Sequence, residues 1–434
     1  MAGEWVETTL GGVADFLSGG TPSKDRPDYW GGSIPWVSAK DMKRFRLHDT
    51  KDHLTSDGAE NGTKVVPLGT VLLLARGMTL LNDVPICVAG QAMAFNQDVK
   101  ALRPKSGVRN EFLPYLLLGH KERLLASVDL AGHGTGRLNS DELKSLDVQL
   151  PPEPEQRAIA HILGTLDDKI ELNRRMSQTL EATARALFKS WFVDFDPVRA
   201  KVEGRDPGLP QPLADLFPDS FEDSELGEIP KGWKVGRLAD EVEHLRDQEN
   251  PLSSADELFH HFSIPAFDEG QTPKPEYGES IKSQKSRVPA GVVLLSKLNP
   301  EIERVWMVDV RQGERAVCST EFLVLRALSP FTRSYVYCLL RSPLFRQQIQ
   351  GLVTGTSKSH QRAQVDSILN VAMVLPPPPV IAAFDHFADS LLARTLECRR
   401  ESHTLAALRD TVLPRLISGE MRVKYAETLA ENIT

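Results

Sequence analysis

The sequence is poor in cysteine and has no long apolar run. Its four cysteines are far apart and none belongs to a Cys-x-x-Cys pair, which argues against a structural zinc site and a disulfide framework. No stretch approaches the roughly 20 apolar residues of a membrane-spanning helix. The N-terminal residues also lack the basic and then apolar layout of a signal peptide. We therefore expect a cytoplasmic protein.

Sequence motifs of common enzymes are missing as well. There is no Gly-x-x-x-x-Gly-Lys-Ser/Thr loop for nucleotides, no dinucleotide fingerprint, no His-x-x-x-His pair and no nucleophile elbow. The Asp/Asn-Pro-Pro-aromatic tetrapeptide of amino-methyltransferases is absent too. These absences favour a binding protein over an enzyme. We expect no catalytic residue and no metal site in this chain.

The net charge of −8 is concentrated in one segment. Residues 203–228 hold eight acids and one base, which leaves 50 basic against 51 acidic residues elsewhere. Two stretches are basic: residues 322–365 have six basic residues and no acid, and residues 40–51 have five basic residues against two acids. Such stretches are usually solvated surface, but their distribution leaves a nucleic-acid partner open.

The chain repeats itself at an offset of 221–225 residues. Val66 to Leu73 resembles Val288 to Leu295, Gly134-Thr135 resembles Gly355-Thr356, and Leu150-Pro151-Pro152 resembles Leu375-Pro376-Pro377. The echoes occur in the same order at nearly constant spacing. They predict a duplicated pair of domains, because two copies with so long a period do not make a solenoid.

Each proline cluster precedes a long heptad-like stripe. In the first copy a 4-3-4-3 spacing from Ile159 to Trp191 selects ten residues, of which eight are apolar; the stripe from Phe384 to Leu416 has seven. We expect the two helices to pair as a coiled coil, although two separately packed amphipathic helices are the alternative. A helix over 155–191 has a length of about 55 Å at ~1.5 Å per residue. Pro414 is expected to kink or end the second helix.

These patterns predict an α+β fold with two mixed α/β domains, each followed by a long helix. Short β-branched runs predict strands at 65–75, 86–89, 292–296 and 305–310. Helices are expected over 109–125 and over 334–352, the latter broken at Ser342-Pro343. The expected segments are listed in chain order: domain 1 over 1–150, helix over 151–198, acidic proline-rich extended linker over 199–230, domain 2 over 231–375, helix over 376–420 and tail over 421–434.

Five segments have a distinctive sequence: Leu17-Ser-Gly-Gly-Thr-Pro-Ser23, Tyr29 to Val37, Leu150-Pro-Pro-Glu-Pro-Glu-Gln-Arg157, Ser190-Trp-Phe-Val-Asp-Phe-Asp-Pro197 and Leu413 to Glu420. They resemble segments of a known family, the specificity subunits of type I restriction–modification systems. The resemblance covers nearly the whole chain. Pro378-Pro-Val-Ile381 departs from the family's Pro-x-x-Glu-Gln pattern.

The resemblance implies two target-recognition domains separated by two long helices that pack as an antiparallel coiled coil. Each domain would read one half of a split sequence in double-stranded DNA, with the helices acting as a ruler. It implies a non-catalytic subunit that recruits two modification subunits and, in some systems, restriction subunits. S-adenosylmethionine, ATP and Mg²⁺ are then expected in those partners and no cofactor in this chain. A two-module protein–protein scaffold on a helical rod is the alternative, and an enzyme fragment without readable motifs is a third.

Candidate DNA contacts are the cations, hydroxyls and exposed backbone donors of loops and strand ends. In the first half they are Gly20, Thr21, Ser23, Lys24, Lys40, Lys43, Arg44, Arg46, Arg76, Thr135 and Arg137. In the second half they are Lys297, Asn299, Thr356, Ser357, Lys358 and Arg362. For each of them an ordinary turn or surface position is the competing interpretation.

An aromatic cluster ends the first long helix. Trp191, Phe192 and Phe195 fit core packing, and they also fit docking of a partner subunit, because aromatic anchors are favoured in interfaces. We name them as candidate partner-binding residues.

Overall fold

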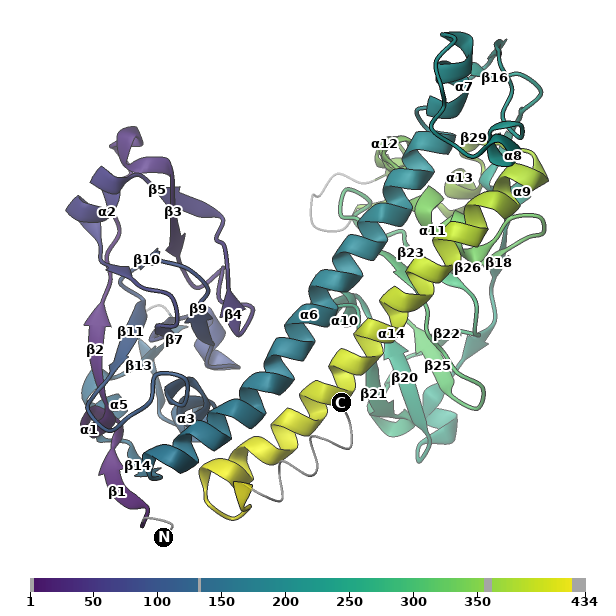
Figure 1. Ribbon diagram of the computed structural model, residues 1–434. Helices are drawn as coiled ribbons and strands as arrows, with labels where there is room; N and C mark the ends of the chain where they lie inside the picture. Colours follow the sequence, from purple (N-terminus) through teal and green to yellow (C-terminus); the bar gives the residue numbers. More distant parts are fainter. Residues whose placement is uncertain (1–3, 132–133, 355–360, 424–434) are drawn as a thin grey trace. The chain divides into compact units, whose positions relative to one another are not determined.

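The computed structural model describes residues 4–131, 134–354 and 361–423 (Figure 1). Contacts divide the chain into two units: residues 1–172 with 402–434 form unit 1, and residues 173–401 form unit 2. Each unit combines several small sheets with short helices and a part of each of the two long helices. The predicted α+β fold class is confirmed.

Unit 1 is built on a five-stranded sheet with the order β2-β11-β7-β9-β4. Its strands are β2 (Ala14–Ser18), β11 (Val99–Pro104), β7 (Val71–Leu74), β9 (Ile86–Ala89) and β4 (Arg46–Leu47). A second sheet has the order β5 (Asp52–Leu54), β3 (Trp30–Val37), β10 (Met93–Phe95) and β6 (Val65–Val66). All four side chains of β7 are buried, as expected for a continuous apolar run in a central strand.

Smaller elements complete unit 1. β1 (Val6–Thr9) pairs with β14 (Asp147–Leu150), and a three-stranded sheet consists of β12 (Val128–Ala131), β13 (Thr135–Leu138) and β8 (Arg76–Gly77). The helices are α1 (Leu10–Val13), α2 (Ser56–Gly62), α3 (Leu113–Gly119), α4 (Lys121–Ala126) and α5 (Ser140–Ser145). The helix expected over 109–125 therefore starts later, at Leu113, and is interrupted at His120.

Unit 2 repeats this plan with a central sheet of the order β18-β26-β23-β24. Its strands are β18 (Val242–Leu245), β26 (Phe322–Ala327), β23 (Val293–Ser296) and β24 (Val305–Met307). A second sheet has the order β19 (Gln248–Glu249), β22 (Lys285–Arg287), β25 (Arg315–Cys318), β20 (Leu258–Phe262) and β21 (Lys274–Tyr277). Two further pairs are β17 (Lys234–Arg237) with β29 (Ala372–Leu375), and β27 (Val353–Thr354) with β28 (Arg362–Ala363).

The short helices of unit 2 include a broken pair. They are α9 (Leu238–Glu241), α10 (Ile264–Asp268), α11 (Arg333–Leu340), α12 (Pro343–Gln350) and α13 (Val365–Leu369). The break predicted at Ser342-Pro343 is confirmed, because α11 ends before Ser342. The Ser342 hydroxyl caps α12 by accepting a hydrogen bond from the Phe345 N–H.

Equivalent backbone hydrogen bonds confirm the duplication. Leu10 N donates to Leu146 O at 2.8 Å, and Leu238 N donates to Val371 O at 3.0 Å. Likewise Lys105 N donates to Val13 O at 2.9 Å, and Leu328 N donates to Glu241 O at 2.8 Å. The two units share a framework of pairings that connects residues far apart in the sequence.

The two long helices are α6 (Glu153–Phe192) and α14 (Pro378–Ile417), each of 40 residues. In unit 1 the first half of α6 shares a core with the end of α14, through residues such as Leu163 and Leu416. In unit 2 the second half of α6 shares a core with the start of α14, through residues such as Phe188 and Phe384. The helices therefore pair in antiparallel fashion, as Figure 1 lets the reader follow.

The seam between the helices follows the predicted heptad spacing. None of the ten residues of either predicted stripe is exposed. Two polar residues of the α6 stripe form hydrogen bonds with α14. Asn173 Nδ2 donates to Glu401 Oε2 at 2.8 Å, and Ser177 Oγ donates to Thr395 O at 3.5 Å. The helix α14 continues through Pro414 to Ile417, so Pro414 does not end the helix where it stands.

The acidic segment over 199–230 is folded, so the expected extended linker is wrong. It contains the end of α7 (Asp196–Val202), α8 (Gln211–Ala214) and a hairpin of β15 (Phe221–Ser224) with β16 (Gly227–Pro230). Phe217 and Ile229 are buried, and Phe217 belongs to the core of unit 2. Apolar residues spaced among the acids gave this segment enough burial to fold.

No helix in the described part of the chain combines the length and apolar character that crossing a membrane requires.

Candidate nucleic-acid interface

Two of the predicted arginines stand side by side on the three-stranded sheet of unit 1. In β13 and β8, Arg137 pairs with Arg76, and Gly136 pairs with Gly77. Directly opposed residues of antiparallel strands project from the same face, so the two guanidinium groups share one side of the sheet. Gly136 permits this close packing, because a Cβ there would lie 2.7 Å from Leu80 Cβ.

Both arginines are exposed and uncompensated. Across residues 4–131, 134–354 and 361–423, neither Arg76 nor Arg137 has an ion pair or a side-chain hydrogen bond. Asp129 lies opposite Arg137 on β12, yet it forms no ion pair with Arg137. Like charges placed directly opposite each other are destabilising. An anion bound between the two guanidinium groups would relieve that repulsion.

Two lysines extend this basic surface. Burial lowers the pKa of Lys100, and the positive charges of Arg137 and Lys144 lower it further. Lys100 Nζ donates to Ser18 Oγ at 2.7 Å, which fixes its position on β11 beside β2. We call Arg76, Lys100, Arg137 and Lys144 the basic surface. The sequence indicated neither lysine, because single cations in an alternating strand and a short helix carry no local signal.

The predicted loop Gly20 to Lys24 divides into a buried anchor and an exposed tip. Gly20 N donates to Phe95 O at 3.0 Å and to Thr63 Oγ1 at 3.1 Å. A Cβ at Gly20 would lie 2.2 Å from Gly62 O, so this glycine is required by packing. Thr21, Ser23 and Lys24 are exposed, and Thr21 Oγ1 donates to Gln97 Oε1 at 2.6 Å. These three side chains can reach a ligand.

The basic stretch at residues 40–46 does not act as one surface. Lys40 pairs with Asp52 at 2.6 Å, and this hydrogen bond is the main reason that the pKa of Asp52 is lowered, with Lys24 contributing. Arg46 pairs with Asp168 of α6 at 2.5 Å and is half-buried. Lys43 and Arg44 are exposed and line a cavity of about 760 Å³. Arg46 therefore anchors β4 to the helix.

In unit 2 the predicted residues are only partly described. Thr356, Ser357 and Lys358 lie outside the described residues. Arg362 forms two-pronged hydrogen bonds with Glu321, the shortest at 2.8 Å. Lys297 and Asn299 follow β23, as expected, and both are half-buried.

Asn299 and Thr135 are placed by their backbones. Asn299 has a left-handed backbone with φ 47° and donates its N–H to Gln361 O at 2.8 Å. It corresponds to Gly77, which bears φ 155°. Thr135 begins β13 and is half-buried.

The aromatic cluster is a core, which corrects its assignment as a partner-binding site. Trp191, Phe192 and Phe195 are 2%, 7% and 7% exposed and lie in the core of unit 2. Trp191 meets Phe217 edge to face at 5.2 Å between ring centroids. Phe217 and Phe221, from the segment expected to be a linker, pack against Trp191 and Phe195 and so cover the cluster, which no local pattern indicated.

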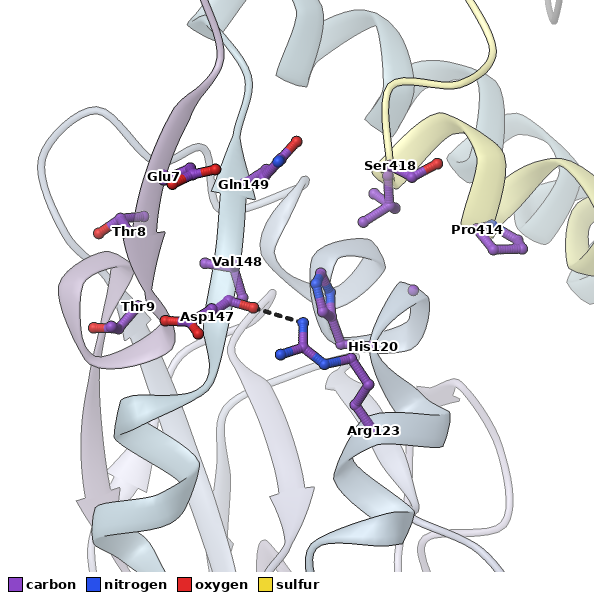
Figure 2. A pocket seen from close by; sticks show the side chains of 12 residues that line it. Glu7, Thr8, Thr9, His120, Arg123, Asp147, Val148, Gln149, Pro414 and Ser418 are labelled. Carbon is purple, nitrogen blue, oxygen red and sulfur yellow. Dashed lines mark hydrogen bonds between the residues drawn. The ribbon is translucent and has the colours of Figure 1, made fainter.

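A separate cavity in unit 1 contains none of the predicted contacts. It has a volume of about 720 Å³ and is lined by β1, β14, the junction of α3 with α4, and the end of α14. Figure 2 shows Arg123 reaching across to Asp147, where its Nη1 donates to the backbone oxygen at 2.8 Å. Burial lowers the pKa of His120, whose Nδ1 contacts Leu116 O. No group of three metal-ligating side chains occurs among the described residues.

The geometry thus defines a duplicated two-domain protein with paired helices and an exposed arginine pair. Residues 2–182 match the model of the type I restriction modification DNA specificity domain. The MjaIX type I specificity subunit of Methanocaldococcus jannaschii is 25% identical over 436 residues, which cover 97% of this chain and 94% of that protein.

Two further comparisons agree. The EcoR124I/EcoR124II specificity subunit of Escherichia coli is 29% identical over 166 residues, 38% of this chain and 41% of the relative. The crystal structure of the type I S subunit from M. genitalium has a TM-score of 0.57 at 13% identity, covering 95% of this chain and 96% of that one, which supports the fold. The chain is thus similar to type I specificity subunits along nearly its whole length, and its residues 2–182 are similar to their DNA specificity domain.

Proposed function

We propose that this chain is the non-catalytic subunit that reads a two-part DNA sequence for a type I methyltransferase and endonuclease. One observation carries the proposal: unit 2 repeats the backbone pairings of unit 1, and unit 1 contains most of the matched DNA specificity domain. A duplicated recognition framework suits a DNA target with two separately read halves. The exposed arginine pair of unit 1 supplies the positive charge that phosphate contacts need.

The partners follow from the same proposal. Two modification subunits would bind S-adenosylmethionine and methylate DNA, and restriction subunits would supply ATP- and Mg²⁺-dependent cleavage. This chain would bind no cofactor and would act in the cytoplasm. The buried aromatic residues at the end of α6 are not part of that partner surface.

Methylation mapping tests the proposal. In a host that carries this chain with its modification partner, we expect methylated adenines confined to one two-part sequence, and we expect that pattern to vanish when this chain is deleted. A pattern that persists without the chain would refute the role in target reading. Adenine methylation by the purified chain alone would refute the non-catalytic assignment.

The long helices are expected to set the spacing between the two read half-sequences. The units meet in sequence after Leu172 of α6 and after Glu401 of α14, so one heptad inserted at each point preserves the contacts within each unit. The insertion adds about 10 Å to each helix, or about 3 base pairs at ~3.4 Å per pair. We predict a gap longer by about 3 base pairs with both half-sequences unchanged, read out by methylation mapping.

A seven-residue insertion at a turn provides the matched control. Gly313 occupies an exposed turn in unit 2, and a side chain added there would meet nothing within 4 Å. An insertion beside it should leave the gap unaltered. If the double-helix insertion also leaves the gap unaltered, the helices do not set the spacing.

A further inference from the structure

The duplication allows the basic surface of unit 1 to be compared with its counterpart in unit 2. Leu138 N donates to Ala75 O at 2.9 Å, and Ala363 N donates to Lys297 O at 3.0 Å. Leu138 and Ala363 are therefore equivalent. Arg137 and Arg362, which directly precede them in the sequence, are equivalent as well. Arg76 pairs with Arg137. On the equivalent side Arg362 pairs with Leu298, and its other partner is Thr354 of β27.

A carboxylate is also shared by both units. Ala75 N donates to Asp98 O at 2.8 Å, and Lys297 N donates to Glu321 O at 3.0 Å. Asp98 is therefore equivalent to Glu321, but it is shorter by one methylene group. The Asp98 carboxylate accepts from Asn96 Nδ2 at 3.3 Å and makes no ion pair with Arg137. Glu321, by contrast, reaches Arg362 and accepts from both Nε and Nη2.

The two units thus present opposite electrostatics at one position. In the described part of the chain, unit 1 has two guanidinium groups that form no ion pair, with Asp129 opposite one of them, and unit 2 has one guanidinium already engaged by a carboxylate. A guanidinium fork binds carboxylate and phosphate with the same two-pronged geometry. Glu321 therefore holds Arg362 in the way that a phosphate group would.

We propose that Arg76 and Arg137 bind a backbone phosphate of DNA in the first recognition domain. In the second domain Glu321 pairs with Arg362, the equivalent of Arg137, in place of a phosphate. The two domains then hold DNA unequally, with the first contributing more of the sequence-independent affinity. This inference rests on the proposed function. Lys100 and Lys144 add positive charge to the phosphate site, and Asp129 is the one acidic side chain directly across the sheet from Arg137.

Salt dependence tests the first part. The full chain, with its modification subunits, is titrated onto a 40-base-pair duplex of arbitrary sequence at about 50 to 200 mM salt. Each phosphate contact contributes a slope of about −0.9 in log affinity against log salt, a fall of about 3.5-fold over this range. Arg137→Gln should make the slope shallower by about one contact, and the double variant with Arg76→Gln by up to two.

Arg103→Gln is the matched control. Arg103 is exposed on β11, three residues from Lys100, so it projects from the opposite face of the strand. Its removal changes the net charge equally and should leave the slope nearer to that of the unaltered protein. If the Arg76 and Arg137 variants match Arg103→Gln, the phosphate site is refuted.

Glu321→Gln tests the second part through a gain of binding. The amide preserves the shape of Glu321 but removes the negative charge that compensates Arg362. We expect tighter duplex binding at about 50 mM salt and a slope steeper by about one contact. Glu314→Gln is the control, because exposed Glu314 in the same unit accepts from the Arg311 backbone N–H. Equal effects of the two substitutions would refute the role of Glu321.

Failure of this inference is distinguishable from failure of the proposed function. If the unaltered complex binds no duplex, the proposed function fails. A second outcome is that the unaltered complex binds duplex and methylates one two-part sequence while every arginine variant keeps the same salt slope. That result would support the proposed function and refute the phosphate site. Thermal unfolding of each variant confirms that the fold is retained.

Discussion

Arg409→Met is expected to destabilise unit 1 by about 3–5 kcal/mol, because it leaves a buried carboxylate without its partner. Arg409 Nη1 lies 2.7 Å from Asp167 Oδ1, and the Asp167 side chain is 4% exposed. The other oxygen, Oδ2, accepts from the Tyr115 hydroxyl at 2.9 Å. Burial already raises the pKa of Asp167, whereas Arg409 lowers it. The loss is measured by hydrogen exchange in unit 1, since a two-unit protein need not unfold in one step.

Two further variants separate this ion pair from a general effect of lost charge. Asp167→Asn combined with Arg409→Met should recover most of the stability, because the amide is neutral and still accepts from Tyr115. Arg415→Met on the same helix should cost less than about 1 kcal/mol, since Arg415 and Glu420 are 46% and 65% exposed. If Arg409→Met costs no more than Arg415→Met, the pair does not hold α6 to α14.

The long helices and the duplication were predictable because their signals are local. Heptad spacing identifies the buried seam of α6 and α14 without knowledge of the partner, and proline clusters mark where both helices start. Short apolar runs likewise identify β9 and β23. The bounds of the helix expected over 109–125 were wrong because its first turns and the interruption at His120 depend on packing.

The sequence did not indicate which arginines lack an ion-pair partner and can bind a ligand. Arg46, Arg137 and Arg362 have similar local settings, because each is an arginine in a short strand. Their roles differ because Arg46 meets Asp168, Arg362 meets Glu321, and Arg137 meets another arginine. These partners come from distant parts of the chain. Composition therefore indicated candidate contacts, whereas long-range pairing decides which of them has a free charge.

A buried carboxylate distinguishes the two units and leads to the second large effect. Glu241 is 0% exposed, and neither of its carboxylate oxygens has a hydrogen-bond partner among the described residues. Its backbone oxygen accepts from Leu328 N, as that of Val13 accepts from Lys105 N. Glu241 therefore occupies the position that buried Val13 occupies in unit 1. Burial raises the pKa of Glu241 well above its ordinary value of 4.5, and the charge of Asp240 adds to this.

Glu241→Val is expected to stabilise unit 2 at neutral pH by about 2 kcal/mol or more, since it removes an unsatisfied buried polar group. Below pH 4.5, the ordinary pKa, the carboxyl is protonated in both folded and unfolded chains. As pH rises toward the higher folded pKa, only the unfolded chain loses the proton, so the unaltered protein loses up to about 1.4 kcal/mol per pH unit. The advantage of the variant should therefore grow with pH over that window.

Hydrogen exchange of the β18 and β26 amides, with variant and unaltered protein compared at each pH, measures this advantage. Glu243→Gln on the same strand is the control, because Glu243 is 50% exposed and pairs with Arg326 at 3.1 Å. Its effect should show no comparable growth with pH, since removing an exposed, paired side chain does not relieve the burial of a carboxyl group. Glu241→Gln should share the pH dependence of the valine variant but give less stability, because the amide remains buried without partners. An advantage of Glu241→Val that is constant with pH would mean that Glu241 is ionised in the folded protein.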